Sequence, residues 1–158
     1  MLSSVGMSEQ LRVSLESPQS GWMSVRLLAE GGQFLAAVGH APYDSLRDLA
    51  EVLSGLAAGG RGGVVRWNAE PVEYDFVFTG EGGRAELRVV RYADHRREDA
   101  TARTAFAHAG AREELCLAFW RELRSLRERA GTDVFPQNWR RPFPEREFQQ
   151  LSAALGRE

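Results

Sequence analysis

The clearest structural signal is Val72-Glu73-Tyr74-Asp75-Phe76-Val77-Phe78-Thr79, followed by Gly80-Glu81-Gly82-Gly83 and by residues 84–92. Aromatic residues alternate with acidic and aliphatic ones in the first segment, which is the period-two pattern of a half-buried β-strand. The glycine-rich segment predicts a turn into a second strand. We therefore expect an antiparallel hairpin at the centre of the fold.

Pairing Thr79 with Arg84 gives this hairpin a consistent register. Asp75 then lies opposite Arg88, and such a cross-strand pair of opposite charges contributes about 0.2–1 kcal/mol. A shift by one residue would mix the two faces of the sheet.

The rest of the chain supplies further strands and three helices. Alternating or β-rich segments predict strands at residues 10–16, 22–29, 33–38 and 101–107. Apolar residues at helical spacing predict a helix that begins near Asp44 and ends before the glycine-rich run 58–63. The strongest helix is expected at residues 111–130 and the last one from about Pro144, with an irregular proline-containing stretch between them.

This element order predicts an α+β fold, with a mainly antiparallel sheet of about six strands and with helices packed on one face. The 158 residues are the usual size of one domain, so we expect a single domain over 1–158, with residues 1–8 flexible.

Composition restricts the function. The net charge of −2 argues against a nucleic-acid-binding protein, although all basic residues are arginine. The single cysteine, Cys116, provides no disulfide and no metal cluster, which favours a reducing compartment. Residues 1–10 lack the pattern of a signal peptide, and no apolar run approaches about 18 residues, so we expect a cytoplasmic protein without a membrane partner.

No motif in the sequence points to catalysis, a metal or a cofactor. His40, His95 and His108 lack the spacing of metal ligands. Residues 93–99 contain acids and a histidine beside Arg96 and Arg97, which is typical of a charged surface loop. Cys116 falls on the apolar side of its helix, where a buried thiol is the usual interpretation. We therefore assign no catalytic residue, and the sequence favours a protein that is not an enzyme.

A first candidate site combines Trp67, Glu70 and Tyr74. A carboxylate beside aromatic rings can have a raised pKa and act as an acid or base. The simpler interpretation places Glu70 at a surface turn before Pro71, with no second carboxylate to complete a catalytic pair.

A second candidate is Phe135-Pro-Gln-Asn-Trp-Arg-Arg-Pro-Phe143, which includes Trp139, Arg140 and Arg141. Tryptophan and arginine dominate the energetics of protein interfaces, and prolines reduce the entropy lost on binding. The alternative is that Trp139 packs the C-terminal helix onto the core and leaves the two arginines in solvent.

Several of these features together resemble a known group of proteins. They are Trp67-x-x-Glu-Pro71, the aromatic strand at 74–78, Phe119-Trp120, and Trp139-x-x-Pro-Phe-Pro144. The combination resembles small α+β proteins of GC-rich bacteria, some of which are immunity proteins found beside polymorphic toxins. The resemblance implies a cytoplasmic protein that blocks a toxin by binding it, and it assigns no catalytic residue.

The sequence thus predicts a non-catalytic protein-binding module with a protein partner and no cofactor. The alternative is a small-molecule-binding protein or an enzyme that uses the sheet face around Tyr74, Glu70 and Arg88. A homodimer formed through an edge strand also remains open.

Overall fold

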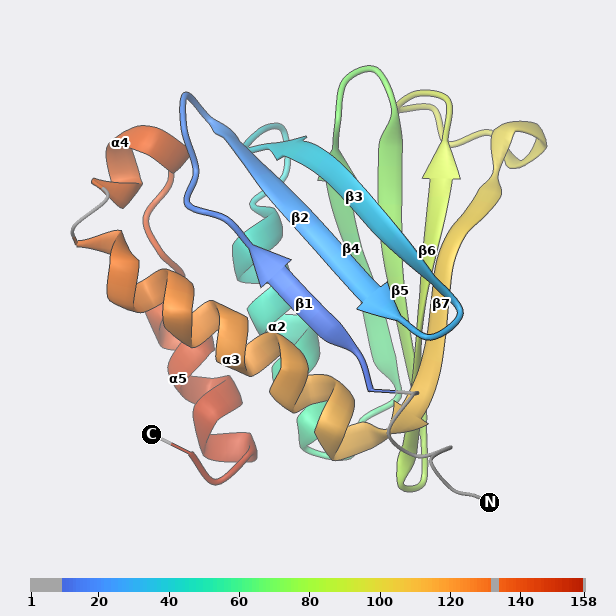
Figure 1. Ribbon diagram of the computed structural model, residues 1–158, viewed down its shortest axis with the longest axis vertical. Helices are drawn as coiled ribbons and strands as arrows, with labels where there is room; N and C mark the ends of the chain where they lie inside the picture. Colours follow the sequence, from blue (N-terminus) through green and yellow to red (C-terminus); the bar gives the residue numbers. More distant parts are fainter. Residues whose placement is uncertain (1–9, 132–133, 158) are drawn as a thin grey trace.

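The computed structural model describes residues 10–131 and 134–157 (Figure 1). Within them, seven strands form one antiparallel sheet whose spatial order, β1 to β7, is also their order in the chain. The strands are β1 (Arg12–Leu15), β2 (Trp22–Ala29), β3 (Gly32–Gly39), β4 (Gly62–Asn68), β5 (Glu73–Glu81), β6 (Arg84–Tyr92) and β7 (Arg103–Ala111). The helices are α2 (Ser45–Ala57), α3 (Arg112–Ala130), α4 (Phe135–Trp139), α5 (Glu145–Ala154) and the 3-10 turn η1 (Asp99–Thr101).

The α+β class and the antiparallel sheet are confirmed, but the sheet has seven strands rather than about six. The additional strand is β4, which begins in the glycine run that was expected only to end a helix. A Cβ at Gly62 would lie 2.0 Å from the carbonyl oxygen of Phe78, so glycine is required where β4 approaches β5. The expected flexible segment 1–8 lies outside the described residues.

The register of the central hairpin differs from the expected one by two residues. The turn is Gly82-Gly83, so Glu81 pairs with Arg84, and Asp75 lies opposite Val90. Gly80 belongs to β5 and not to the turn, which accounts for the shift. Because the shift is even, each side chain keeps its predicted face.

The sheet is bent between its third and fourth strands. β3 pairs with β4 only through Gly39 and Asn68, and β1–β3 then cross in front of β4–β7 (Figure 1). The Phe34 ring on β3 meets the rings of Tyr74 and Phe76 on β5 edge-on, with centroids 4.9 and 5.8 Å apart. The inner sides of the two halves therefore share one core.

The helices complete this core. α2 packs on β4, β5 and α5, whereas α3 lies against β1, β6 and β7. α4 is a short helix within the stretch that was expected to be irregular, and a proline in its first turn suits a helix start. No helix in the described ranges is both long and apolar enough to cross a membrane.

Side chains of α3 close the first edge of the sheet. The backbone N–H of Leu15 donates to a carboxylate oxygen of Glu122 at 3.0 Å, and Arg129 donates to the Leu15 carbonyl at 2.9 Å. These bonds satisfy backbone groups that an edge strand would otherwise expose for pairing.

Candidate functional site

The six predicted binding residues differ widely in exposure. The Trp67 and Trp139 side chains are fully buried. Tyr74 and Arg141 are half-buried, and only Glu70 and Arg140 are exposed. In this conformation Glu70 and Arg140 are therefore the two of the six that can contact a partner directly. A binding role for the six residues stays a prediction.

The alternative site around Tyr74, Glu70 and Arg88 is not brought together. Tyr74 lies on the inner side of β5, edge-on to Phe34. Arg88 lies opposite Val77, on the other face of the sheet from Tyr74. Glu70 occupies the exposed turn between β4 and β5.

The segment after α3 is anchored to the first half of the sheet. Arg141 donates from Nε to the carbonyl of His40 at 2.6 Å, and the Trp139 ring meets the His40 ring edge-on at 6.3 Å. The Gly21 N–H donates to the carbonyl of Asn138 at 2.6 Å. Trp139 and Arg141 thus help to hold α4 against the β1–β2 turn and the end of β3.

This anchoring places Arg140 near Gly21, the residue before an exposed tryptophan that was not predicted as a site residue. Trp22 is 38% exposed, and its ring lies 3.3 Å from the position of a Cβ on Gly39. The Arg140 side chain passes 3.4 Å from the position of a Cβ on Gly21, the residue before Trp22. We call Trp22, Arg140 and the three residues that support them, Gly21, Gly39 and His40, the Trp22–Arg140 surface.

Local geometry fixes this surface. Ser20 and Gly21 have φ values of 55° and 85°, as in the tight turns that join antiparallel strands. Arg140 ends α4 with φ 72°, a left-handed conformation that glycine usually occupies at the end of a helix. An arginine in this left-handed conformation costs some backbone conformational energy, which a glycine would not.

The surface continues along the outer face of β2 and β3. A shallow cavity of about 300 Å³ adjoins Trp22 and reaches Ser24 and Ala37. Farther along the strands, Leu28 and Leu35 are 39% and 62% exposed, and Arg26 lies opposite Leu35.

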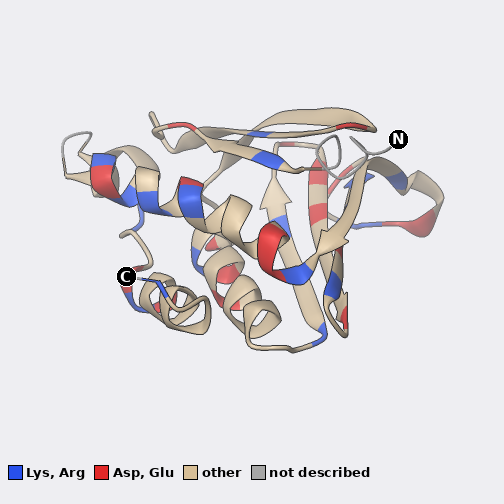
Figure 2. Ribbon diagram, turned by 60° about the horizontal axis from the view of Figure 1, so that its bottom comes forward, with Lys and Arg blue, Asp and Glu red and all other residues tan. Residues whose placement is uncertain are grey.

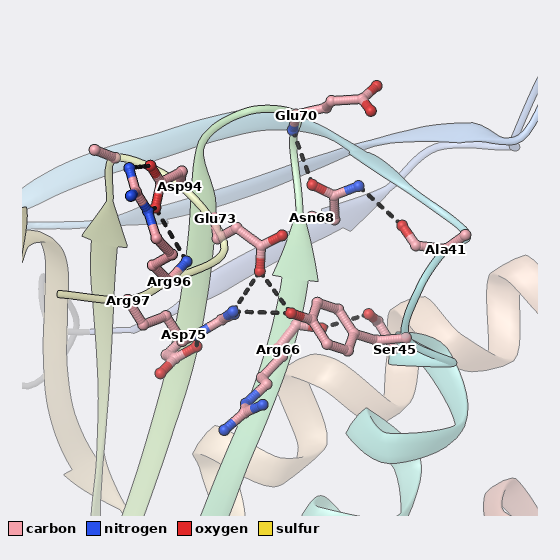
Figure 3. A network of polar contacts seen from close by, with 12 residues as sticks. Ala41, Ser45, Arg66, Asn68, Glu70, Glu73, Asp75, Asp94, Arg96 and Arg97 are labelled. Carbon is pink, nitrogen blue, oxygen red and sulfur yellow. Dashed lines mark hydrogen bonds and ion pairs between the residues drawn. The ribbon is translucent and has the colours of Figure 1, made fainter.

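A second feature is a buried cluster of charged and aromatic side chains near the start of β5 (Figure 3). Arg97, from the loop between β6 and β7, binds the carboxylates of Glu73 and Asp75, the latter at 2.8 Å. Arg97 also donates to the Tyr43 hydroxyl at 2.9 Å, and that hydroxyl donates to Glu73 at 2.8 Å. The Arg97 guanidinium lies over the rings of Tyr43 and Tyr92, at 5.4 and 5.8 Å.

This cluster is removed from solvent. The side chains of Arg97, Glu73 and Asp75 are only 12%, 3% and 13% exposed. Burial, together with the hydrogen bond to Glu73, raises the pKa of Tyr43, which therefore remains protonated at neutral pH. The loop 93–99 was expected to be a charged surface loop, and for Arg97 this is wrong, because its side chain turns inward and holds the loop onto β5.

The structure also bears on two other kinds of site, a reactive cysteine and a metal site. Cys116 is fully buried, and burial raises its pKa to about 12, so its thiol is protonated at neutral pH. Among the described residues, no three His, Cys, Asp or Glu side chains are grouped so that they could hold a metal ion.

No protein-family model, no curated protein and no solved structure matches this chain. A function is therefore inferred from its own side chains.

Proposed function

We propose that this protein is a non-catalytic protein-binding module and that the Trp22–Arg140 surface is its contact site. The observation that carries the proposal is an exposed arginine that passes close to Gly21, the chain neighbour of an exposed tryptophan, although the two segments are far apart in the sequence. These two residue types are enriched among the side chains that supply most of the binding energy at interfaces.

The conformation of Arg140 strengthens this assignment. A glycine would suit φ 72° better, so the backbone alone does not account for an arginine at this position. Arg140 is exposed, in contrast to Arg141, whose guanidinium is engaged with backbone carbonyls. Arg140 is thus the arginine of the predicted motif that remains available to a partner.

The form of the site favours a protein partner. It is an open face with a shallow cavity, whereas small-molecule sites are usually deep, enclosed and largely apolar. Arginines are interspersed with acidic residues along α3 and the sheet (Figure 2), which supports a protein rather than a nucleic acid as partner. With the helices packed on the inner side, as expected from the sequence, the outer face of β2 and β3 would stay free for binding.

The most specific version of the proposal is a cytoplasmic immunity-type protein that neutralises a toxin. It rests on the sequence resemblance together with the exposed contact surface. In that case the partner would inhibit growth when expressed alone, and co-expression of this chain would relieve the inhibition.

The test compares three variants of the tagged full-length chain in pull-downs from lysate of the source organism. Trp22→Thr removes the ring but keeps a strand-forming residue, and Arg140→Gly removes the guanidinium while suiting the backbone. Val64→Thr is the matched control, because Val64 is 49% exposed on β4, outside the surface.

We expect one stoichiometric protein partner that Val64→Thr retains. The other two variants should each weaken binding by about 2 kcal/mol, or about 30-fold. Equal binding by all variants, or a bound small molecule in place of a protein, would refute the proposal. Circular dichroism of each variant verifies that the fold is intact.

A further inference from the structure

The outer face of the first three strands extends the Trp22–Arg140 surface. Trp22, Arg26 and Leu28 have the same parity on β2, so their side chains point to the same side of the sheet. Leu28 lies opposite Arg12 of β1, and Arg26 lies opposite Leu35 of β3. Residues directly opposite each other in an antiparallel pair share a face. We call Arg12, Trp22, Arg26, Leu28 and Leu35 the β1–β3 outer face.

Together, these two surfaces carry arginines whose charge the rest of the chain leaves unpaired. Arg12, Arg26 and Arg140 are exposed, and within the described part of the chain no ion pair or hydrogen bond engages their side chains. The exposed acids nearby are Glu16, which lines the shallow cavity beside Trp22, and Glu30, in the turn between β2 and β3. The whole chain has a net charge of −2, so the excess of arginine is local to this side of the molecule.

Apolar side chains lie between these arginines. Leu28 and Leu35 are 39% and 62% exposed, and they lie directly opposite Arg12 and Arg26, respectively. Guanidinium groups are weakly hydrated and form bidentate ion pairs with carboxylates, so they suit contacts made beside apolar side chains. A partner that matches this face therefore presents carboxylates around an apolar patch.

We propose that the partner of this protein has an acidic surface around an apolar patch, and that it binds along the β1–β3 outer face as well as at the Trp22–Arg140 surface. This inference rests on the proposed function and adds to it the chemistry of the partner. A nucleic acid would pair with Arg12 and Arg26 but would give Leu28 and Leu35 no apolar contact. A protein surface with carboxylates beside apolar side chains matches both kinds of residue.

The first test measures equilibrium binding of the full-length chain to polypeptides of defined charge. A random copolymer of glutamate and tyrosine is an acidic probe with apolar rings, and a copolymer of lysine and tyrosine is its basic counterpart. The chain should bind the acidic copolymer and not the basic one. Phosphatidylserine vesicles and single-stranded DNA are anionic probes that are not polypeptides. Tighter binding to either of them than to the acidic copolymer would overturn the proposal.

Substitutions then locate the binding of the acidic copolymer. Arg26→Glu replaces an attraction by a repulsion and should weaken binding about tenfold at low salt. Glu16→Gln removes the acid beside Trp22 and should strengthen binding. Arg146→Glu is the matched control, because Arg146 is exposed on α5 and forms no ion pair with a described residue. At about 1 M salt, where the Debye length is about 3 Å, Arg26→Glu and the control should bind alike. Equal binding by these two variants at low salt would contradict the proposed surface.

The protein captured from lysate of the source organism separates this inference from the proposed function. We expect that Trp22→Thr and Arg26→Glu both weaken its binding and that Arg146→Glu retains it. A captured protein that is lost with Trp22→Thr but bound equally by Arg26→Glu and Arg146→Glu would overturn the acidic partner and leave the contact site in place. Binding of the acidic copolymer without any captured protein would instead refute the proposed function. The circular dichroism spectrum of each variant verifies that it is folded.

Discussion

Replacing Arg97 with methionine tests whether the buried cluster stabilises the fold. The substitution keeps an apolar side chain of similar length but removes the guanidinium. Glu73 then keeps its hydrogen bond from Tyr43 but loses its ion pair with Arg97. Its carboxylate is left as an unpaired charge on a side chain that is only 3% exposed. Asp75, at 13% exposure, loses its ion pair as well.

The magnitude follows from this burial. Breaking a buried ion pair so that a charge is left uncompensated costs about 3–5 kcal/mol. For a chain of this size, each kcal/mol lowers Tm by about 2–4 °C, so the expected decrease is about 6–20 °C. The assay is thermal and urea unfolding, followed by circular dichroism.

The matched control is Arg96→Met in the same loop. Arg96 binds Asp94 at 2.9 Å, but its side chain is 64% exposed, so solvent screens this pair and its loss should change Tm little. A decrease for Arg97→Met no larger than that for Arg96→Met would show that the cluster is not desolvated in solution. Adding Glu73→Gln to Arg97→Met removes the uncompensated charge, and this double variant should recover part of the lost stability.

Two further predictions concern α3. Hydrogen bonds from Arg127 and Gln149 lower the pKa of Glu145 below its usual 4.5, so this stabilisation is present above pH 4.5 and is lost as the pH falls through the lowered pKa. Arg127→Gln should move the Glu145 midpoint upward in an NMR titration and make acid unfolding less steep, whereas an unchanged midpoint would contradict the assignment. Glu122→Ala leaves the Leu15 N–H without its charged acceptor and should lower the free energy of unfolding in urea by about 1.5–3 kcal/mol. Glu128→Ala is the control, because the Glu128 side chain is 61% exposed and pairs with Arg124. Equal effects of the two substitutions would refute a role of Glu122 in closing the sheet edge.

Periodicity in the sequence predicted the α+β class and the faces of the central hairpin, because both follow from short-range alternation. The observed register differs from the predicted one by two residues because Gly80 continues β5 and Gly82-Gly83 alone forms the turn. β4 was missed because glycines at its start concealed the alternation of Val65 and Trp67. There, glycine reflects the close approach of two strands and not a loop.

The candidate site was only partly predictable. The motif that contains Arg140 is recognisable in the sequence, but the exposed Trp22 was not predicted. The signal for Trp22 was present, since it has the opposite parity to the buried Met23 and Val25 and must face outward. The Arg97 cluster was hidden for a different reason, because its members come from three segments that only the tertiary fold brings together. Glu73 and Asp75, two acids that alternate with the aromatic residues at the start of β5, were the available hint that a cation lies nearby.

The order of the strands has a consequence for how the chain folds during its synthesis. Every strand pairs with its neighbour in sequence, so each ladder can close soon after its second strand leaves the ribosome. The hydrogen bonds that close the β1 edge cannot form this early in synthesis, because Glu122 is 107 residues and Arg129 is 114 residues beyond Leu15. The β1 edge is therefore satisfied only late in synthesis, and a nascent chain stalled before α3 would leave that edge unprotected.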